Sequence, residues 1–283
     1  MNYIVLDLEW NQSAKGKKYA LPGMPFEIIQ MGAVKLNEQF EVIDEFDRLV
    51  CPQVYPVLHS ICGEVTGITQ EMLADGEHFV DTALDFLAWC GQDYIFCTWG
   101  SMDLVELQRN LNHYAIEPDF PMPFLFYDVQ KLYSLCFLNG KERLSLQASI
   151  EQLHMAENEQ YHMALSDARY TAQIMKRLDF KKVKAFYSID TYRVPQRRKE
   201  EICMNFGNYS KYISRAFDTR EKAANDRRVR SCNCFLCGKP MERKIKWYVY
   251  FRFKVQCHNS KASSFTRYSL IFKNIFILSP DWS

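Results

Sequence analysis

The sequence lacks a long hydrophobic run: no stretch reaches the roughly 18 consecutive apolar residues that a membrane-spanning helix needs. The chain also begins without a basic leader and reaches a carboxylate at Asp7, so its N-terminus does not predict a secretory signal peptide. These two absences predict a cytoplasmic protein that does not associate with a membrane.

The sequence also gives little indication of a disulfide framework, although it contains ten cysteines. Most of them lie singly in apolar surroundings, as Cys62, Cys90, Cys97 and Cys136 do. Because there is no secretory signal, we interpret these residues as buried thiols in a reducing cytoplasm.

The 283 residues are enough for one large domain, or for one domain and a small module, and the net charge of +1 hides a division along the chain. Residues 1–192 carry 15 Lys and Arg against 27 Asp and Glu, a net charge of −12. Residues 193–283 carry 20 against 7, a net charge of +13. The asymmetry predicts two functional parts. The basic part either contacts a polyanion or is a solvated tail.

Hydrophobic patterning predicts an α/β domain over residues 1–180. Apolar strand-forming segments come first, two of them joined by a short polar connection, which is typical of a β-meander. Helical and strand patterns then alternate, which favours a mixed sheet flanked by helices. The expected strands are 3–10, 26–37, 40–52 and 94–99, and the expected helices include 80–91, 101–114, 144–155 and 163–178.

The basic part of the chain has two segments of different composition. Residues 181–230 are polar and basic, contain Pro195, and predict a helical linker. Residues 231–283 contain cysteines and strand-forming residues such as those of "KIKWYVYFRFKV", so they predict a small β-module.

Two carboxylates end the first expected strand, in the segment "MNYIVLDLEW". Side chains alternate along a strand, so Asp7 and Glu9 point to the same face. Two neighbouring, partly buried negative charges are costly without compensation. Either the strand has run out into solvent, or the pair binds a divalent cation, which prefers oxygen ligands.

Other residues extend this pattern. Asp103 follows the strand–glycine segment "IFCTWG", at the start of a helix that its charge would also stabilise. His162 and Asp167 lie in "HMALSD", where both can border one site if His162 precedes the first full helical turn. Each of these residues alone also fits a purely structural role.

Taken together and in this order, D-x-E, the later Asp and H-x-A-x-x-D resemble the DEDDh family of 3′–5′ exonucleases. The segments "FEIIQMGAV", "TGIT" and "TWGSMD" resemble the ERI-1-like branch of that family. The resemblance covers about residues 1–180. It implies an RNase H-like fold with a five-stranded mixed sheet.

The resemblance also implies a catalytic set, in which Asp7, Glu9, Asp103 and Asp167 hold two Mg²⁺ or Mn²⁺ ions. Asp7 would bridge both ions, Glu9 and Asp167 would bind the one nearer the nucleophile, and Asp103 would help to hold the other. Two such ions can neutralise a phosphodiester and generate hydroxide. His162 would act as the general base, and the product would be a nucleoside 5′-monophosphate.

The function predicted from these residues is metal-dependent 3′–5′ hydrolysis of single-stranded 3′ ends, with RNA favoured. The alternatives are a DNA-directed exonuclease and a catalytically inactive nucleic-acid-binding protein. The terminal base would stack on apolar side chains next to the motifs, for which Met31, Ile68 and Trp99 are the candidates. Core packing is the competing explanation for all three.

The β-module contains a second pattern of metal-ligand type. Cys234-x-x-Cys237 followed by glycine is typical of a zinc-ribbon turn, and Cys257 and His258 come twenty residues later. We therefore predict one structural zinc ion in a zinc-ribbon-like module, with Cys232 as a substitute ligand. Unpaired thiols are the alternative. The module could dock nucleic acid, bind a protein partner or only stabilise the fold.

Overall fold

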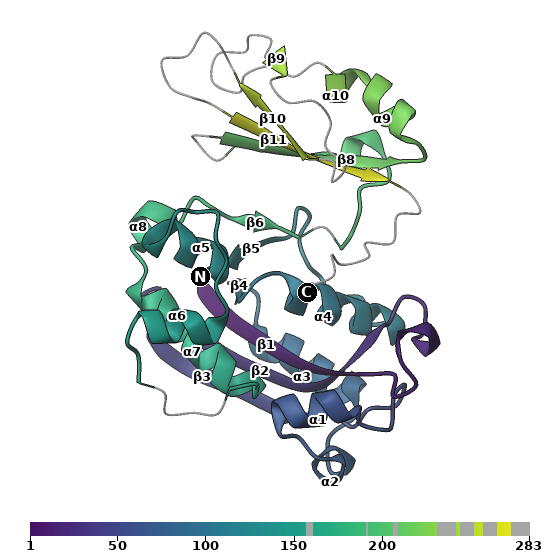
Figure 1. The fold of residues 1–283 in the computed structure, drawn as a ribbon, viewed down its shortest axis with the longest axis vertical. Helices are drawn as coiled ribbons and strands as arrows, with labels where there is room; N and C mark the ends of the chain where they lie inside the picture. Colours follow the sequence, from purple (N-terminus) through teal and green to yellow (C-terminus); the bar gives the residue numbers. More distant parts are fainter. Residues whose placement is uncertain are drawn as a thin grey trace. The chain divides into compact units, whose positions relative to one another are not determined.

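The computed structural model describes residues 1–156, 161–190, 192–205, 209–230, 242–243, 252–256 and 265–272 (Figure 1). The chain forms two compact units, Met1–Tyr192 and Arg193–Ser283.

The first unit is built on a mixed six-stranded sheet with the strand order β3-β2-β1-β4-β5-β6. Three long strands form the expected antiparallel meander, and β4 and β5 then add in parallel to β1 and to each other. The strands are β1 Asn2–Gln12, β2 Phe26–Leu36, β3 Val42–Leu49, β4 Tyr94–Thr98, β5 Leu125–Asp128 and β6 Ser188–Ile189.

The sixth strand corrects the expectation of five. β6 has only two residues and pairs antiparallel with β5 at the edge of the sheet. Two residues are too short to show the alternating pattern by which strands are recognised in a sequence. Residues 181–192, which the sequence places in the linker, belong to the first unit.

Helices cover both faces of this sheet (Figure 1). They are α1 Ser60–Thr66, α2 Gln70–Ala74, α3 Phe79–Cys90, α4 Met102–His113, α5 Val129–Phe137, α6 Leu146–Gln152, α7 Ala164–Arg177 and α8 Phe180–Val183, and a 3-10 turn, η1, spans Lys17–Tyr19. Among the helices that the structure describes, none has both the length and the apolar character that crossing a bilayer needs.

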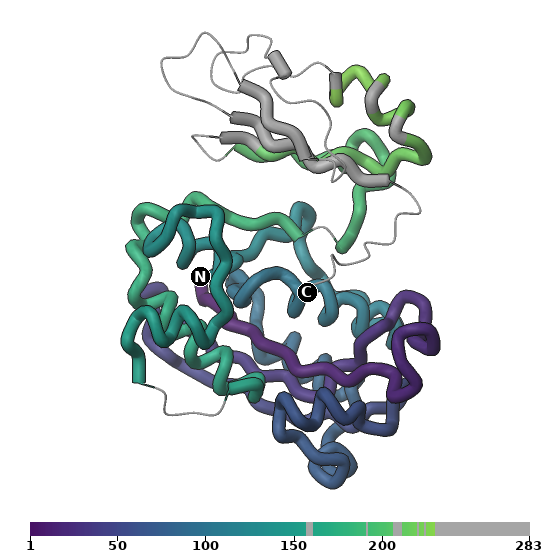
Figure 2. Tube along the Cα trace, in the orientation of Figure 1, coloured from purple at the N-terminus to yellow at the C-terminus, as the bar shows by residue number. Residues whose placement is uncertain are grey.

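The alternation of β1 divides the core into two clusters. Ile4, Leu6 and Leu8 pack with residues of α3 and α4 on one face of the sheet. Tyr3 and Val5 pack with residues of α5, α6 and α7 on the other. Asp7 and Glu9 continue the Tyr3–Val5 series, so their side chains emerge on the face covered by α7. Figure 2 shows this late helix beside the N-terminal strands.

The second unit contains a five-stranded sheet of order β7-β8-β11-β10-β9. Its elements are η2 Arg198–Glu200, β7 Ile202–Asn205, β8 Tyr209–Phe217, α9 Arg220–Asn225, α10 Arg227–Arg230, β9 Glu242–Arg243, β10 Arg252–Gln256 and β11 Phe265–Phe272. The strands β7 and β8 thus differ from the expected helical linker. β8 pairs in parallel with β11, and pairing across such a sequence separation overrides local helical preference.

Candidate active site

Strand β1 supplies two of the site carboxylates. Asp7 and Glu9 are both half-buried, and they lie opposite Gly32 and Gln30 of β2. The pairing register shifts directly after Glu9, between Glu9 and Trp10. Such an irregularity twists a strand locally and is common next to functional sites.

Helix α4 brings the third carboxylate to this strand. Asp103 lies in the first turn of α4 and is only 6% exposed. Its Oδ1 accepts a hydrogen bond of 3.3 Å from the backbone N–H of Leu8, the residue between Asp7 and Glu9. This bond joins the N-terminus of α4 to the strand at the position of the first two carboxylates.

Helix α7 approaches the sheet closely because β2 has a glycine beneath it. A Cβ atom at Gly32 would lie 2.1 Å from the backbone nitrogen of Leu165 and 2.2 Å from the carbonyl carbon of Ala164. The buried Gln30 accepts a 3.1 Å hydrogen bond from the backbone N–H of Ala164 through Oε1 and donates through Nε2 to Asp47. The start of α7 is thus held directly over β2.

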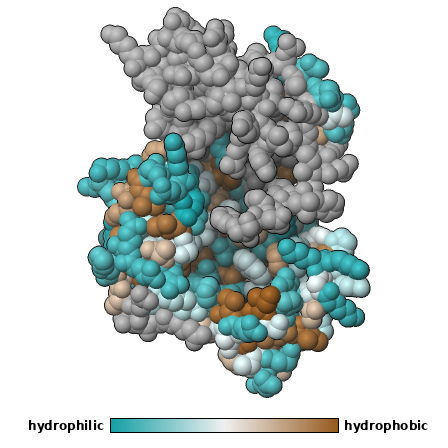
Figure 3. Space-filling model, in the orientation of Figure 1, coloured by the Kyte–Doolittle hydropathy of each residue, from teal (hydrophilic) through white to brown (hydrophobic). Residues whose placement is uncertain are grey.

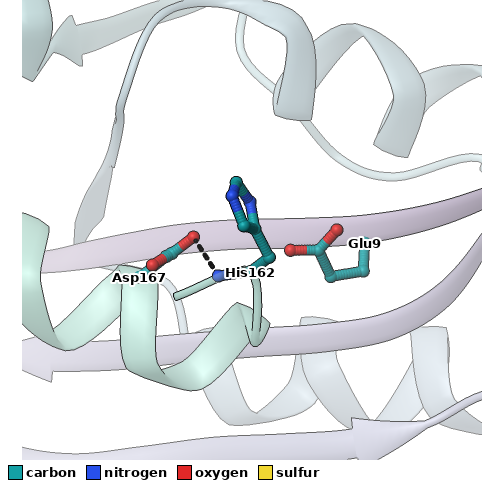
Figure 4. A group of neighbouring side chains, drawn as sticks. All are labelled: Glu9, His162 and Asp167. Carbon is teal, nitrogen blue, oxygen red and sulfur yellow. Dashed lines mark hydrogen bonds between the residues drawn. The ribbon is translucent and has the colours of Figure 1, made fainter. Parts of the chain in front are cut away.

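This placement brings Asp167 and His162 to the site (Figure 4). Asp167 is in the first turn of α7 and is 8% exposed, whereas His162 is exposed and lies just before the helix. His162 has a φ of 61°, in the left-handed region, and its backbone N–H donates a 3.2 Å hydrogen bond to Oδ2 of Asp167. The imidazole points away from the Asp167 carboxylate, while the backbone N–H of His162 stays bonded to that carboxylate.

The ligand atoms of Glu9, His162 and Asp167 lie within 4.8 Å of one another. Figure 4 shows the three side chains around one region, with Glu9 and Asp167 on either side of His162. Oδ1 of Asp167 is buried and has no hydrogen-bond partner among the described residues. A buried carboxylate oxygen without a partner is costly unless it binds another group.

Burial raises the pKa values of all four carboxylates, and nearby carboxylate charges add to the shift for Asp7, Glu9 and Asp103. Burial, then the charges of Asp103, Asp167 and Glu9, raises the pKa of Asp7 well above its ordinary value. Burial and the nearby aspartates raise the pKa of Glu9 to about 8. Burial raises the pKa of Asp103 to about 7 and also raises that of Asp167, although backbone hydrogen bonds oppose both shifts.

Such a set of donors fits divalent cations. Four carboxylates offer the hard oxygen ligands that Mg²⁺ and Mn²⁺ prefer, and a bound cation turns their repulsion into attraction. The unpartnered Oδ1 of Asp167 is available as one ligand. The imidazole of His162 also lies within reach of this region.

The three candidate base-stacking residues occupy different environments. Met31 is fully buried in the core, and Ile68 is 2% exposed between Ile29 and Leu73, so neither offers an open surface to a base. The sequence-based assignment of these two therefore does not fit the structure, because apolar residues next to the motifs fill the core instead. Trp99 is half-buried, and its indole N–H donates to the backbone carbonyl of Leu144.

The expected zinc ligands Cys234, Cys237, Cys257 and His258, and the substitute Cys232, lie outside the described residues.

Sequence reasoning missed two residues that position the site, Gly32 and Gln30. Gly32 lies inside an otherwise apolar strand, and an isolated strand glycine often marks a close backbone approach, so a usable indication was present. Gln30 gave no comparable indication. Its role depends on the partner that α7 provides 134 residues later.

The RNase_T exonuclease family model matches residues 4–175. Three curated relatives are similar to this chain. The 3′-5′ exoribonuclease 1 of Rattus norvegicus is 25% identical and aligns with 54% of this chain and 46% of its own length. The DNA polymerase III PolC-type of Thermotoga petrophila is 29% identical and aligns with 53% of this chain and 10% of its own length. The probable 3′-5′ exonuclease KapD of Bacillus subtilis is 27% identical and aligns with 61% of this chain and 82% of its own length.

Two solved structures share the fold. The nuclease domain of 3′hExo, a DEDDh family member bound to rAMP, matches with a TM-score of 0.55 and 23% identity, over 67% of this chain and 96% of that one. A second structure, described as 3′-end specific recognition of histone mRNA stem-loop by 3′-exonuclease, matches with a TM-score of 0.54 and 20% identity. The match covers 75% of this chain and 90% of that one. The chain spans about half or less of the first curated relatives it matches.

Proposed function

The chain belongs to the RNase_T exonuclease family, and from this premise we propose that it is a metal-dependent 3′–5′ exonuclease of single-stranded 3′ ends, with RNA favoured over DNA. The observation that carries the proposal is the convergence of the β1, α4 and α7 carboxylates with His162 around residues 7–9 of β1. All of these residues lie within the part of the chain that the family model matches.

Asp7, Glu9, Asp103 and Asp167 would hold the cations. When bound, two divalent ions neutralise the scissile phosphate and lower the pKa of a coordinated water. The protein's own contribution is preorganisation. The Leu8 N–H fixes one oxygen of Asp103, the His162 N–H fixes one oxygen of Asp167, and the remaining oxygens stay available.

His162 would take the proton from the attacking water. Its side chain is exposed and lies beside Glu9, so it can approach a water molecule at this site without crossing the core. A neutral imidazole accepts a proton readily near neutral pH. Because the backbone N–H of His162 is engaged by Asp167, the position of the base depends on the α7 start.

The preference for RNA is supported by relatives whose names describe exoribonucleases. The PolC-type relative favours DNA as the alternative substrate. An inactive binding protein would be expected to have lost site carboxylates, and this chain retains all four. Of the three candidate stacking residues, Trp99 keeps some exposed surface for the terminal base.

The second unit is proposed to add affinity for the substrate. It carries the net charge of +13, which suits contact with phosphates, while the first unit is acidic overall. Comparing the full chain with a 1–192 fragment, once circular dichroism shows that the fragment folds, tests this role. The fragment should hydrolyse short substrates normally and bind long ones more weakly, with a flatter salt dependence. An unchanged salt slope would remove the docking role.

The decisive experiment incubates the protein with Mn²⁺ and 5′-labelled RNA or DNA, single-stranded or duplex, and identifies the products. We expect a ladder shortened from the 3′ end, release of nucleoside 5′-monophosphates, and faster cleavage of single-stranded RNA. Asp7→Ala serves as the control and should be inactive while remaining folded. Full activity in this variant would refute the metal assignment, and equal or faster cleavage of DNA would favour the alternative substrate.

A further inference from the structure

The connection between β1 and β2 is positively charged, although the first unit to which it belongs is acidic overall. Lys15, Lys17 and Lys18 fall within four positions, although residues 1–192 contain only 15 basic residues and are acidic overall. All three lysines are exposed, and the next residue, Tyr19, is 58% exposed. Figure 3 shows hydrophilic surface where this connection lies, at the right of the first unit.

This basic loop, residues 13–25, has a defined structure. Its lysines lie in and before the η1 turn, which is bounded by backbone hydrogen bonds from Gly16 to Ser13 and from Ala20 to Lys17. After the turn, the hydroxyl of Tyr55 accepts a 2.8 Å hydrogen bond from the N–H of Leu21 and donates one to the carbonyl of Met24. The lysines are therefore presented from a fixed backbone.

Tyr55 is itself held in place by a buried carboxylate. Glu27, which is 1% exposed, accepts hydrogen bonds from the backbone N–H groups of Gln53, Val54 and Tyr55, the last at 2.6 Å. Asn11 of β1 donates from the same side to the carbonyl of Tyr55. The hydrogen bonds that hold Tyr55, and through it the basic loop, thus come from Asn11 on β1 and Glu27 on β2, the two strands next to the site.

The charges of the basic loop form no ion pair with the part of the chain that the structure describes. No ion pair among the described residues involves Lys15, Lys17 or Lys18. Lys18 instead lies 5.4 Å from the ring centroid of Tyr19. Unpaired ammonium groups beside an exposed aromatic ring are the combination that binds single-stranded nucleic acid, because phosphates pair with the cations and bases stack on the ring.

The loop also lies close to the candidate active site. It starts directly after Gln12, three residues beyond Glu9 on the same strand, a separation of about 10 Å at the usual rise of a strand. By contrast, residues 49–108, which include α1 to α3 and most of α4, contain no Lys or Arg. A strand that leaves the site along β1 therefore meets positive charge within a few nucleotides.

We propose that the basic loop binds the single-stranded substrate on the 5′ side of its 3′-terminal nucleotide. Lys15, Lys17 and Lys18 contact successive phosphates, and Tyr19 stacks on one base. This proposal rests on the proposed exonuclease function and adds to it a binding track for the strand that remains after each cleavage. It predicts that the loop matters for long substrates and not for the shortest ones.

The test compares the full-length triple variant Lys15→Gln/Lys17→Gln/Lys18→Gln with a control of equal charge change. Lys176→Gln/Lys181→Gln/Lys184→Gln removes three exposed lysines, one in the last turn of α7, one in α8 and one directly after α8. Hydrolysis is measured on an RNA dinucleotide and on a 12-mer. Binding of the labelled 12-mer is measured by fluorescence anisotropy at several salt concentrations, in an Asp7→Asn background that prevents cleavage.

For the loop variant we expect an unchanged rate on the dinucleotide and a fall of roughly 10- to 100-fold in kcat/KM on the 12-mer at low salt. The slope of log K against log salt should flatten by about 2, since each lost contact to a single strand contributes about 0.7. Tyr19→Ala should weaken 12-mer binding, while Tyr19→Phe, which keeps the ring, should not. The control variant should match the wild type.

Two results would overturn the proposal. The first is a loop variant that equals the control variant in salt slope and 12-mer activity. The second is an equal loss of activity on both lengths, which would indicate an effect on the active site itself. A wild-type protein that cleaves neither substrate would instead refute the exonuclease function. The anisotropy comparison would still decide the role of the loop in that case.

Discussion

A Cβ atom at Gly32 would lie 2.1 Å from the backbone nitrogen of Leu165, so a single glycine on β2 determines how closely α7 approaches the sheet. Gly32 is also the residue paired with Asp7. The same contact therefore sets the separation between the β1 carboxylates and Asp167, and with it the position of His162.

Gly32→Ala should displace the start of α7 and lower activity by about 100-fold, because misplacing catalytic groups by about 1 Å has effects of this size. Overpacking should also destabilise the fold by about 1–3 kcal/mol. Steady-state kinetics and thermal unfolding measure both. Gly63→Ala, whose nearest contact would be the Leu58 side chain at 3.2 Å, is the control and should retain activity. Wild-type kinetics in Gly32→Ala would show that this spacing is not needed.

The raised pKa values predict that the metal-free protein loses stability as pH rises. The pKa of Glu9 is about 8 when folded against an ordinary 4.5, so the folded state binds more protons than the unfolded state between these values. The contribution of Glu9 to stability should therefore be greatest below about pH 4.5 and should decrease as the pH rises to about 8.

Glu9→Gln should remove this contribution. In protein passed over a chelating resin, the melting temperature of the variant should exceed that of the wild type by a margin that grows from pH 5 to pH 8. Added Mn²⁺ should raise the wild-type value more than that of the variant. A margin independent of pH would contradict the repulsion argument.

His162→Ala should reduce kcat by roughly 10²- to 10⁴-fold, the range for loss of a general base. Binding of Mn²⁺, followed by calorimetric titration, should survive, since the carboxylates are proposed to hold the ions. His113→Ala, which removes an exposed imidazole on α4, serves as the control. If His162→Ala instead loses metal affinity, the imidazole is a ligand and not the base.

Tyr55→Phe should loosen the basic loop by removing its hydrogen bonds to Leu21 and Met24. We expect a loss of about 1–3 kcal/mol in stability, because the buried Met24 carbonyl and the partly buried Leu21 N–H lose their partner. We also expect a higher KM for the 12-mer but not for a dinucleotide. Tyr127→Phe removes a comparable bond to the Lys184 carbonyl. It should reduce stability without changing the dependence on substrate length.

The freshly purified full-length chain should contain one zinc ion, held by Cys234, Cys237, Cys257 and either His258 or Cys232. A small module with little core commonly depends on such a metal for its stability. Elemental analysis measures the number of zinc ions per chain. Cys237→Ser should abolish zinc binding, whereas Cys203→Ser, which changes an exposed cysteine elsewhere in the second unit, should not. Zinc-free wild-type protein would leave the cysteines as unpaired thiols.

The sequence by itself determined the parts of the fold that depend on local pattern. The alternation of β1 placed Asp7 and Glu9 on one face, and the apolar spacing of "MALSDARYTAQIMKRL" predicted the helix that carries Asp167. Their order along the chain was enough to indicate the exonuclease family that the comparison with known families then showed. The strand face, the helix and the family were predictable because hydrophobic periodicity and the order of motifs can be read directly along the sequence.

Only the tertiary structure decided how these parts meet. The sequence could not give the sixth strand, the left-handed turn at His162, the burial of Met31 and Ile68, or the hydrogen bond between Gln30 and Ala164. Each depends on groups that are far apart in the chain and become neighbours on folding. The position of a carboxylate in the site is set by what packs beneath its helix, and at α7 that is a glycine more than 130 residues earlier.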